Sequence, residues 1–242
     1  MPFSFESLTL RKKKHADTVA REQYAKNRIV VCARDSPLSK AQVEEVLLAL
    51  RPFYPSGVCF VPKYIKTRGD LDKSTSLRTL EKSDFFTKEI DETLLGKRCD
   101  VAIHSAKDLP EPLPKGLKIV ALTRGVDPRD VLVFNDEFKE NRSRQLVIAT
   151  SSARREESVR KIGGDVRFVD IRGTIQERLA KLSTKEVDGV VVAEAALIRL
   201  KLTHLPRIFL EGESAKGQGQ LAVVARTDDE KMAALFHCLD EA

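Results

Sequence analysis

The sequence contains no tryptophan, and aromatic residues make up only 6% of its 242 residues. This scarcity argues against a protein that stacks the bases of single-stranded nucleic acid on its surface. No segment approaches the roughly 20 apolar residues of a membrane span. Residues 1–28 lack the apolar stretch of about 7 to 15 residues that a signal peptide needs. We therefore expect a cytoplasmic protein with no nucleic-acid partner and no membrane partner.

Cysteines are few and far apart. Cys32, Cys59, Cys99 and Cys238 include no pair with the short spacing of a zinc knuckle or a dithiol motif. They are expected to be small buried hydrophobic residues in a reducing compartment. The sequence also lacks a glycine-rich phosphate loop, a metal-ligand cluster and a nucleophile elbow. We expect no bound metal.

The composition that remains is that of an ordinary globular protein with a basic excess. Lysine and arginine number 42 against 36 aspartates and glutamates, which gives a formal charge of +6, and 42% of the residues are hydrophobic. This balance excludes disordered, collagenous and disulfide-scaffold chains. The length allows one large domain or two of roughly 100 to 130 residues. A basic chain with few aromatics indicates an anionic partner, which need not be a polymer.

Residues 1–27 are polar, rich in both charges and weakly periodic. We predict that they form an extension outside the core. Their basic run from Arg11 to Lys14 is the only feature that indicates nucleic-acid binding. Such charge runs are usually solvated faces.

From Arg28 onward, short apolar runs alternate with helical patterns. The runs predict strands over 29–33, 58–65, 100–104, 117–122, 131–134, 146–150, 166–171 and 188–193. Several are apolar throughout, as expected when helices cover both faces of a parallel sheet. Ser36 before Pro37, and Thr174 three residues before Glu177, are helix-start signals. The alternation predicts an α/β protein, and the turn-like segment 125–128 can be a crossing between two such units.

Ligands of open α/β sheets lie beyond the carboxyl ends of the strands, where helix N-termini also gather. Four arginines, several hydroxyls and one carboxylate occupy these positions. They are Arg34, Ser36, His104, Ser105, Lys107, Asp108, Thr150, Ser151, Ser152, Arg154, Arg155 and Arg172. Any one arginine is more simply a solvated end or an ion-pair partner. The set together indicates a site for carboxylate or phosphate groups, which guanidinium groups bind bidentately.

The segment 104–110 ends a predicted buried strand and contains a base, a cation and a carboxylate within five residues. Asp108 can stabilise a developing cation or move a proton there. The competing interpretation is that Asp108 caps a turn before Pro110 and that His104 is a hydrogen-bonded core residue. The residues alone favour this second interpretation.

Two further segments can bind anions. Residues 150–155 follow a strand and open a predicted helix, so their hydroxyl and backbone N–H groups form a natural anion cradle, although Ser-Ser before a helix is usually only a cap. Arg178 lies one to two turns into the helix that follows Arg172. A surface ion pair with Glu177 and a ligand contact are equally compatible with its position.

These segments, in this order, resemble the porphobilinogen deaminases, also called hydroxymethylbilane synthases. The resemblance covers about residues 28–240. It rests on RDSPL (34–38), TRGD (67–70), FTKE (86–89), HSAKDLP (104–110), DPRD (127–130), TSSARR (150–155), RG (172–173), RL (178–179) and GQG (217–219).

The resemblance implies a transferase of tetrapyrrole and haem biosynthesis. The family joins four porphobilinogen units head to tail into hydroxymethylbilane, releasing ammonia at each step, on a dipyrromethane primer. Each unit carries an acetate and a propionate. By resemblance, Asp108 is the catalytic carboxylate that faces the pyrrole N–H groups. The residues implied to hold substrate and cofactor carboxylates are Arg34, Ser36, Ser105, Lys107, Thr150, Ser151, Ser152, Arg154, Arg155, Arg172 and Arg178.

The family fold implies two periplasmic-binding-protein-like domains with mixed, mostly parallel sheets and a cleft between them. We expect residues 28–124 and 218–242 to form domain 1 and residues 125–217 to form domain 2. We also expect a monomer.

Two departures from the family pattern concern the cofactor. The family has a third domain whose cysteine binds the primer through a thioether, and we expect that domain to be absent here. Cys238 lies in a helical pattern and not in the glycine-rich context of that cysteine, so we do not expect it to carry the primer. The primer can be held by charge and shape, attached elsewhere or absent. In the loop 80–86, Ser83 replaces a family lysine, and Lys82 beside it is a possible loop contact.

Two functions therefore follow from the sequence. The first is the transferase. The alternative is a non-catalytic module that binds pyrroles or polycarboxylates and has lost turnover with the third domain.

Overall fold

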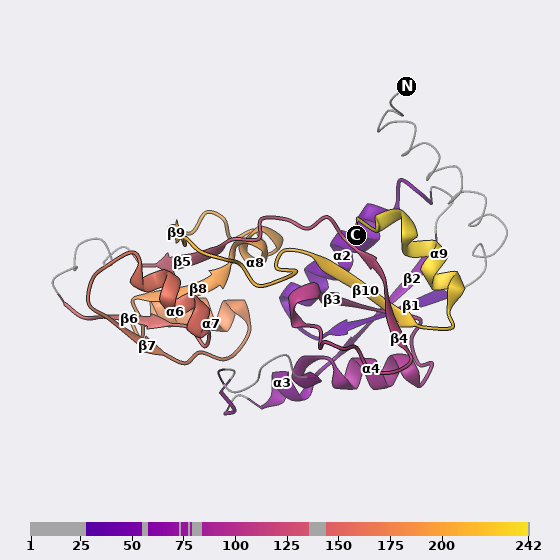
Figure 1. The fold of residues 1–242 in the computed structure, drawn as a ribbon, viewed down its shortest axis with the longest axis horizontal. Helices are drawn as coiled ribbons and strands as arrows, with labels where there is room; N and C mark the ends of the chain where they lie inside the picture. The colour runs from indigo at the N-terminus through magenta and orange to yellow at the C-terminus, as the bar shows by residue number, and fades with distance from the viewer. Residues whose placement is uncertain are drawn as a thin grey trace, which may run out of the picture.

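The structure is a computed structural model that describes residues 28–54, 58–72, 74–76, 78, 84–135 and 144–241. The extension 1–27 and the loop contact Lys82 lie outside the described residues. Two lobes lie side by side along the long axis of the molecule (Figure 1), and each contains one five-stranded sheet.

The sheet of the first lobe has the order β2-β1-β3-β10-β4. Strand β1 (Arg28–Arg34) pairs in parallel with β2 (Cys59–Ile65) and β3 (Val101–Ser105). Strand β10 (Leu221–Arg226) returns from the far end of the sequence and lies antiparallel between β3 and β4 (Leu117–Leu122). The first lobe is therefore built from two separate stretches of chain.

The sheet of the second lobe has the order β7-β6-β8-β5-β9. Strand β6 (Leu146–Ala149) pairs in parallel with β7 (Val166–Val169) and β8 (Gly189–Ala193). Strand β5 (Asp130–Phe134) lies antiparallel between β8 and β9 (Arg207–Phe209). Both sheets are mixed, and the parallel pairs in each bring strand carboxyl ends to one edge.

The helices begin where the local sequence directs. Helix α2 (Pro37–Leu50) starts after Ser36, whose hydroxyl accepts the Ser39 N–H, and proline occupies its first turn, where no hydrogen bond is lost. Helix α7 (Ile175–Ser183) has the predicted capping box of Thr174 and Glu177. The remaining helices are α3 (Arg68–Leu71), α4 (Lys88–Leu95), α6 (Ala153–Arg160), α8 (Glu194–Arg199) and α9 (Glu230–Phe236), with 3-10 helices at Asp84–Phe86, Ala106–Asp108 and His237–Leu239.

Both faces of each sheet are buried. In the first lobe, Val31 packs on the side of α2 and α9, whereas its neighbour Cys32 packs on the side of Ile90 and Leu94 from α4. Successive side chains of a strand point to opposite faces, so both must be apolar when helices cover both faces. The second lobe repeats the arrangement with two cores, one containing Leu197 of α8 and the other Val159 of α6. The predicted α/β class, with two mixed sheets in separate lobes, is confirmed. The residue boundaries of the two domains stay a prediction.

The lobes contact each other away from their sheets. Arg199 of α8 donates to the carboxylate of Glu45 of α2 at 2.7 and 3.0 Å. Arg172 of the second lobe donates to the carbonyl oxygens of Gly69 and Asp72 in the first. In the described part of the chain, no helix is long and apolar enough to cross a membrane.

Candidate active site

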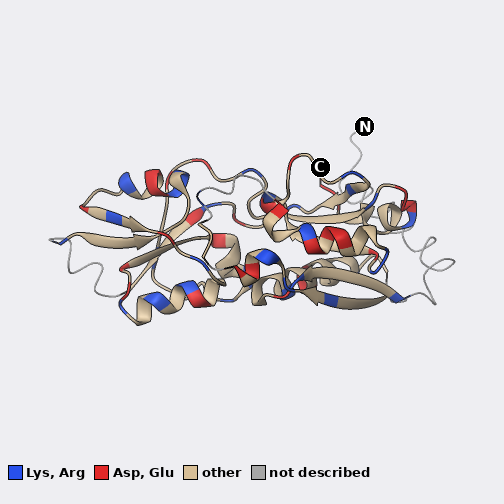
Figure 2. Ribbon diagram, turned by 90° about the horizontal axis from the view of Figure 1, so that it is seen from below, with Lys and Arg blue, Asp and Glu red and all other residues tan. Residues whose placement is uncertain are grey.

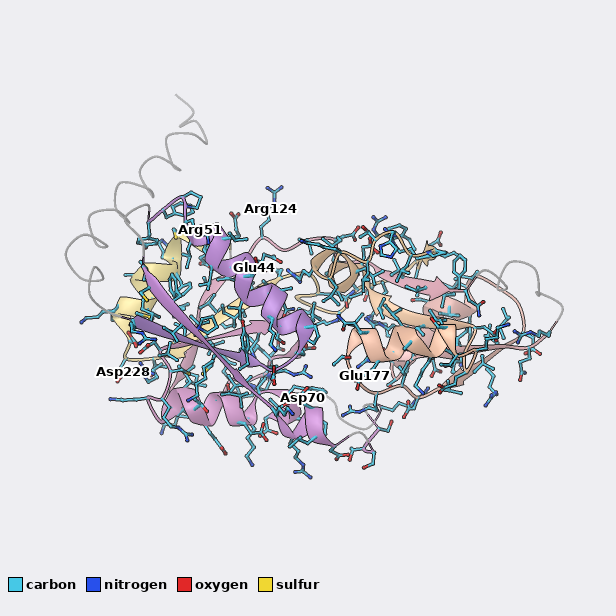
Figure 3. The ribbon with its side chains drawn as sticks, turned by 180° about the vertical axis from the view of Figure 1, so that it is seen from behind. Glu44, Arg51, Asp70, Arg124, Glu177 and Asp228 are labelled. Atoms are coloured by element: carbon cyan, nitrogen blue, oxygen red, sulfur yellow. The ribbon has the colours of Figure 1, made fainter. Side chains whose placement is uncertain are left out.

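A cavity of about 390 Å³ lies between the lobes and is lined from both. Its size is within the range of small-molecule sites. Figure 3 shows Asp70 and Glu177, one from each lobe, near its two sides, and charged residues of both signs lie where the lobes meet (Figure 2). The predicted site residues that line it are Arg34, Ser36, Ser105, Lys107, Asp108, Arg155, Arg172 and Arg178.

The parallel strands explain this gathering. Arg34 ends β1 and Ser105 ends the neighbouring parallel strand β3, which leads directly into the 3-10 helix that contains Lys107 and Asp108. Arg155 lies in the first turns of α6, after β6, and Arg172 follows β7. Carboxyl ends of parallel strands share an edge within each sheet, and the residues at these two edges, one from each sheet, line the same cavity.

Asp108 is an exposed carboxylate that lines the cavity. It lies near two cations: its negative charge acts to raise the pKa values of Lys107 and Arg178. The alternative interpretation had Asp108 capping a turn and His104 as a hydrogen-bonded core residue; Asp108 does end a 3-10 turn, and His104 is buried, with its Nε2 atom lacking a hydrogen-bond partner among the described residues. A carboxylate in this setting can face a positive charge that develops in a ligand.

Arg34 is paired within the protein. Its guanidinium group forms an ion pair with Asp70 and lies 4.3 Å from the centre of the Phe86 ring. Burial raises the pKa of Asp70, but the hydrogen bonds from Arg34 and Thr67 outweigh that effect and hold the pKa below its usual range. Arg34 is therefore oriented before any ligand arrives.

Arg154 and Arg155 also have a protein partner, Asp130, the first residue of β5. Arg155 donates to Asp130 at 2.7 and 3.1 Å, and Arg154 donates at 2.6 Å. Asp130 is 4% exposed. Burial raises its pKa, but the two arginines outweigh this and hold the pKa below its usual range. Arg155 lines the cavity, whereas Arg154 does not.

Arg172, Arg178 and Lys107 form no ion pair with any carboxylate in the described ranges. Arg172 has two buried nitrogens, Nε and Nη1, without a hydrogen-bond partner there. Arg178 donates to the carbonyl oxygen of Gly173 at 2.8 Å, and Lys107 to the side-chain oxygen of Gln218 at 3.1 Å. These three cations share the cavity.

Burial and neighbouring positive charges lower the pKa values of these three cations. Burial, followed by the charge of Arg155, lowers the pKa of Lys107 to about 8. Burial, followed by the charges of Arg155 and Arg172, lowers the pKa of Arg178 to about 10. Burial also lowers the pKa of Arg172. Cations that are costly in the free protein are relieved by an anion, so this part of the cavity is suited to carboxylates.

The predicted cradle 150–152 is engaged with the protein itself. The Ser151 hydroxyl donates to the Ile171 carbonyl and accepts the Ile171 N–H, and the Thr150 hydroxyl accepts the Ser152 N–H. Arg78 donates to the Thr150 carbonyl at 3.1 Å. None of these three hydroxyl residues lines the cavity, and their ligand contacts stay a prediction.

Sequence reasoning assigned no role to Asp70, Asp130 or Gln218. All three lie in segments that carried the resemblance, and Asp130 closes DPRD while Gln218 is the centre of GQG. Gln218 accepts from Lys107 and donates to Asp130 at 3.0 Å, so it links the two lobes through the site. The motifs therefore contained these three residues, but the local sequence does not reveal which side chains they contact.

The fold and the site together define a class: a two-lobed α/β protein of the solute-binding type, with a cationic cleft between the lobes. The structure resembles an ancestral cationic amino acid solute-binding protein with a TM-score of 0.54 and 11% identity, over 93% of this chain and 90% of the other. It also resembles a putative methionine-binding lipoprotein of Bacillus subtilis, with a TM-score of 0.51 and 16% identity, over 88% of this chain and 90% of that one. These likenesses concern the fold alone.

The sequence comparisons are more specific. Residues 29–234 match the family model described as porphobilinogen deaminase, dipyromethane cofactor binding domain. A porphobilinogen deaminase of Caldicellulosiruptor saccharolyticus is 42% identical over 79% of this chain and 66% of its own length. A probable porphobilinogen deaminase of Chlamydia pneumoniae is 39% identical over 86% of this chain and 89% of its own. The chain belongs to the porphobilinogen deaminase family, as the sequence motifs predicted, and the alternative of a non-catalytic binding module is not favoured.

The described residues fit the dipyrromethane cofactor that the family model names. Lys107, Arg172 and Arg178 present cationic groups without a carboxylate partner, and the cofactor's acetate and propionate groups can supply one. None of the four cysteines, all of which lie in the described ranges, lines the cavity. Cys238 is half-buried, packs against the first-lobe core and donates to the Leu235 carbonyl.

Proposed function

We propose that this chain is a transferase that joins four porphobilinogen units head to tail into hydroxymethylbilane and releases one ammonia per unit. The observation that carries the proposal is the cluster of uncompensated cations, Lys107, Arg172 and Arg178, in one cavity with the carboxylate of Asp108. The site is completed by both lobes of one chain, which supports action as a monomer. The four free cysteines support a reducing, cytoplasmic location.

We assign substrate and cofactor binding to the cations that line the cavity. Each porphobilinogen unit brings two carboxylates, and a guanidinium group binds a carboxylate through two parallel hydrogen bonds. Arg172 offers its two unpartnered nitrogens, and Arg178 and Lys107 gain the counter-charge that lowers the cost of their burial. Arg34, Arg155, Ser36 and Ser105 complete this surface.

Thr150, Ser151, Ser152 and Arg154 have a less direct place in the proposal. They support the site by fixing the start of α6 and the position of Asp130, which in turn holds Arg155. A direct contact of these residues with a longer chain of pyrroles remains part of the proposal.

Asp108 is assigned the chemistry. When the nitrogen of the aminomethyl group leaves as ammonia, the carbon stays on the ring and the positive charge remains on the pyrrole of the substrate. A carboxylate that accepts a hydrogen bond from the pyrrole N–H stabilises that charge. The same group accepts and returns a proton as the ring loses its own hydrogen to restore aromaticity. Asp108 is exposed and lines the cavity together with Lys107 and Arg178.

The dipyrromethane cofactor, when bound, supplies the nucleophilic pyrrole carbon to which the first unit is added. Lys107, Arg172 and Arg178 would hold its carboxylates. None of the four cysteines in the described ranges lines the cavity, so the cofactor can be held by charge and shape, attached elsewhere or absent. The intact mass of the freshly purified protein tests this point, since a covalent cofactor adds the mass of two pyrrole units.

The activity is tested with purified protein and porphobilinogen. We expect stoichiometric ammonia and a linear product that cyclises to uroporphyrinogen, which air then oxidises to uroporphyrin for detection. Asp108→Ala should abolish both without unfolding the protein, since the side chain is exposed. Asp228→Ala removes an equally exposed carboxylate at the far end of the first lobe (Figure 3) and should leave turnover unchanged. Full activity of the Asp108 variant would overturn the assignment.

A further inference from the structure

A second, smaller cavity lies behind Asp108. It measures about 50 Å³ and adjoins the large cavity, with which it shares lining residues: Arg34, Ser36, Leu38, Phe86, Ser105 and Asp108. A water molecule needs about 10 to 15 Å³ of such space. The small cavity therefore holds one molecule of that size, or a few.

His104 provides the wall of this cavity on the side of β3. Its side chain is 5% exposed, and its Nε2 atom is buried without a hydrogen-bond partner among the described residues. Buried polar atoms of native proteins are almost always paired, with protein or with a small bound molecule. A molecule in the small cavity can complete this pairing.

The charges around the cavity define which molecule fits. Burial lowers the pKa of His104 to about 4, with Asp108 acting against this shift and Arg34 adding to it. The imidazole is therefore neutral at neutral pH and offers one donor and one acceptor. Arg34 and Asp108 both line the cavity, and their opposite charges balance, which favours a molecule without net charge. The fitting molecule is small, neutral and able both to donate and to accept hydrogen bonds.

We propose that this cavity receives the ammonia released from each porphobilinogen unit, with His104 as its hydrogen-bond partner. The inference rests on the proposed function, which makes ammonia beside Asp108. The bond between the aminomethyl carbon and the ammonium nitrogen breaks, and both of its electrons go to nitrogen. Nitrogen leaves as NH3 with its three hydrogens, and the positive charge stays on the pyrrole against the Asp108 carboxylate. Ammonia held behind Asp108 is kept from adding back to that cation.

A binding experiment tests the cavity without turnover. Protein carrying 15N-labelled histidine is titrated with ammonium chloride at an alkaline pH at which part of the ammonium is neutral ammonia. The Nε2 resonance of His104, assigned by its loss in His104→Gln, should shift and saturate. Tetramethylammonium chloride at equal ionic strength, whose cation is too large and has no N–H, should cause no shift. An ammonium response no larger than that control means that the cavity holds water only, and it overturns the proposal.

A kinetic experiment tests the role in the reaction. Ammonium chloride should slow porphobilinogen consumption by the wild-type protein. His104→Phe, which keeps a ring but lacks both nitrogens, should be about three- to tenfold less sensitive, as expected for one lost hydrogen bond. His104→Gln, which keeps a donor and an acceptor, should retain most of the sensitivity. His204→Phe, at an exposed turn, is the matched control and should behave as wild type.

Failure of the ammonia-cavity proposal can be distinguished from failure of the proposed transferase function. Equal ammonium sensitivity of His104→Phe and wild type overturns the ammonia cavity but leaves the transferase in place. A wild-type protein that consumes no porphobilinogen overturns the proposed function, while the histidine titration still decides what the cavity binds.

Discussion

Arg155 and Arg178 line the same cavity from the same lobe, yet only one of them has a counter-charge in the protein. Arg155 shares the buried Asp130 with Arg154, and across the cleft Arg34 has Asp70. Arg178, Arg172 and Lys107 have no such carboxylate in the described chain. The paired cations are held in place by the fold, whereas the unpaired ones are costly to it and are relieved by a ligand. In the proposed function, the paired cations therefore support the cleft and the unpaired ones bind the carboxylates of the ligand.

The largest effect should come from removing an unpaired cation. Arg178→Met should lower kcat/KM for porphobilinogen by about 100-fold, because a desolvated substrate carboxylate loses its partner at a cost of roughly 2 to 5 kcal/mol. The free energy of unfolding should not fall, because the variant removes a cation repelled by Arg155 and Arg172. Steady-state kinetics and urea unfolding measure the two quantities. Arg167→Met, at an exposed position of β7, is the control, and a large loss of stability in the Arg178 variant would contradict the comparison.

Removing the carboxylate that pairs with Arg154 and Arg155 should lower the stability of the protein, in contrast to the Arg178 variant. Asp130→Asn leaves Arg154 and Arg155 without their buried counter-charge. We expect the free energy of unfolding to fall by about 3 kcal/mol, since breaking one side of a buried ion pair leaves an uncompensated charge. Asp228→Asn should change it by less than about 0.5 kcal/mol. A variant of Asp130 with wild-type stability would show that the pair does not hold the cleft together.

The same pair gives a pH dependence of stability. The folded-state pKa of Asp130 lies below its usual value, so the unfolded chain takes up the proton first as the pH falls. The stabilisation is complete above the unfolded value of about 4 and is lost as the pH falls below it toward the folded pKa. Urea unfolding from neutral to acidic pH should show a steeper loss in the wild type than in Asp130→Asn. Parallel curves would remove Asp130 as a source of acid sensitivity.

Lys107 should give a pH dependence of the opposite sign. Its folded-state pKa of about 8 lies below the unfolded value of about 10.4, so stability should rise between these two pH values, as the native state releases its proton first. Over the same range, substrate binding should weaken, because a neutral amine no longer attracts a carboxylate. The KM of the wild type should therefore rise through about pH 8, and that of Lys107→Arg should stay flat.

Much of the fold could be predicted because each predicted strand is a short apolar run and both faces of the sheets are covered. Two strands were not among the predictions. The three residues of β9 are too few to show a period. The run 221–226 of β10 fits a strand or a buried helix equally well, and its place between β3 and β4 is set by pairing with residues about 100 positions away.

For the candidate site, the positions of several residues could be predicted from the sequence, but their partners could not. Arg34, Asp108 and Arg172 each follow a strand end, which local sequence reveals, and the two sheets place these ends around one cavity. Their ion-pair partners could not be predicted, since Asp70 lies 36 residues from Arg34 and Asp130 lies 25 residues from Arg155. The hydroxyls at 150–152 could not be told from a structural turn, because serine binds its own backbone as readily as an anion.

The return of β10 to the first sheet has a consequence for biosynthesis. A ribosome delivers the chain from its N-terminus, and the strand that fills the space between β3 and β4 begins only at Leu221. The sheet of the second lobe, in contrast, is complete by Phe209. The second lobe can therefore fold before the first. Until β10 is synthesised, β3 and β4 of the first lobe lack the strand that pairs with both of them. Such exposed apolar strands are sites to which chaperones bind.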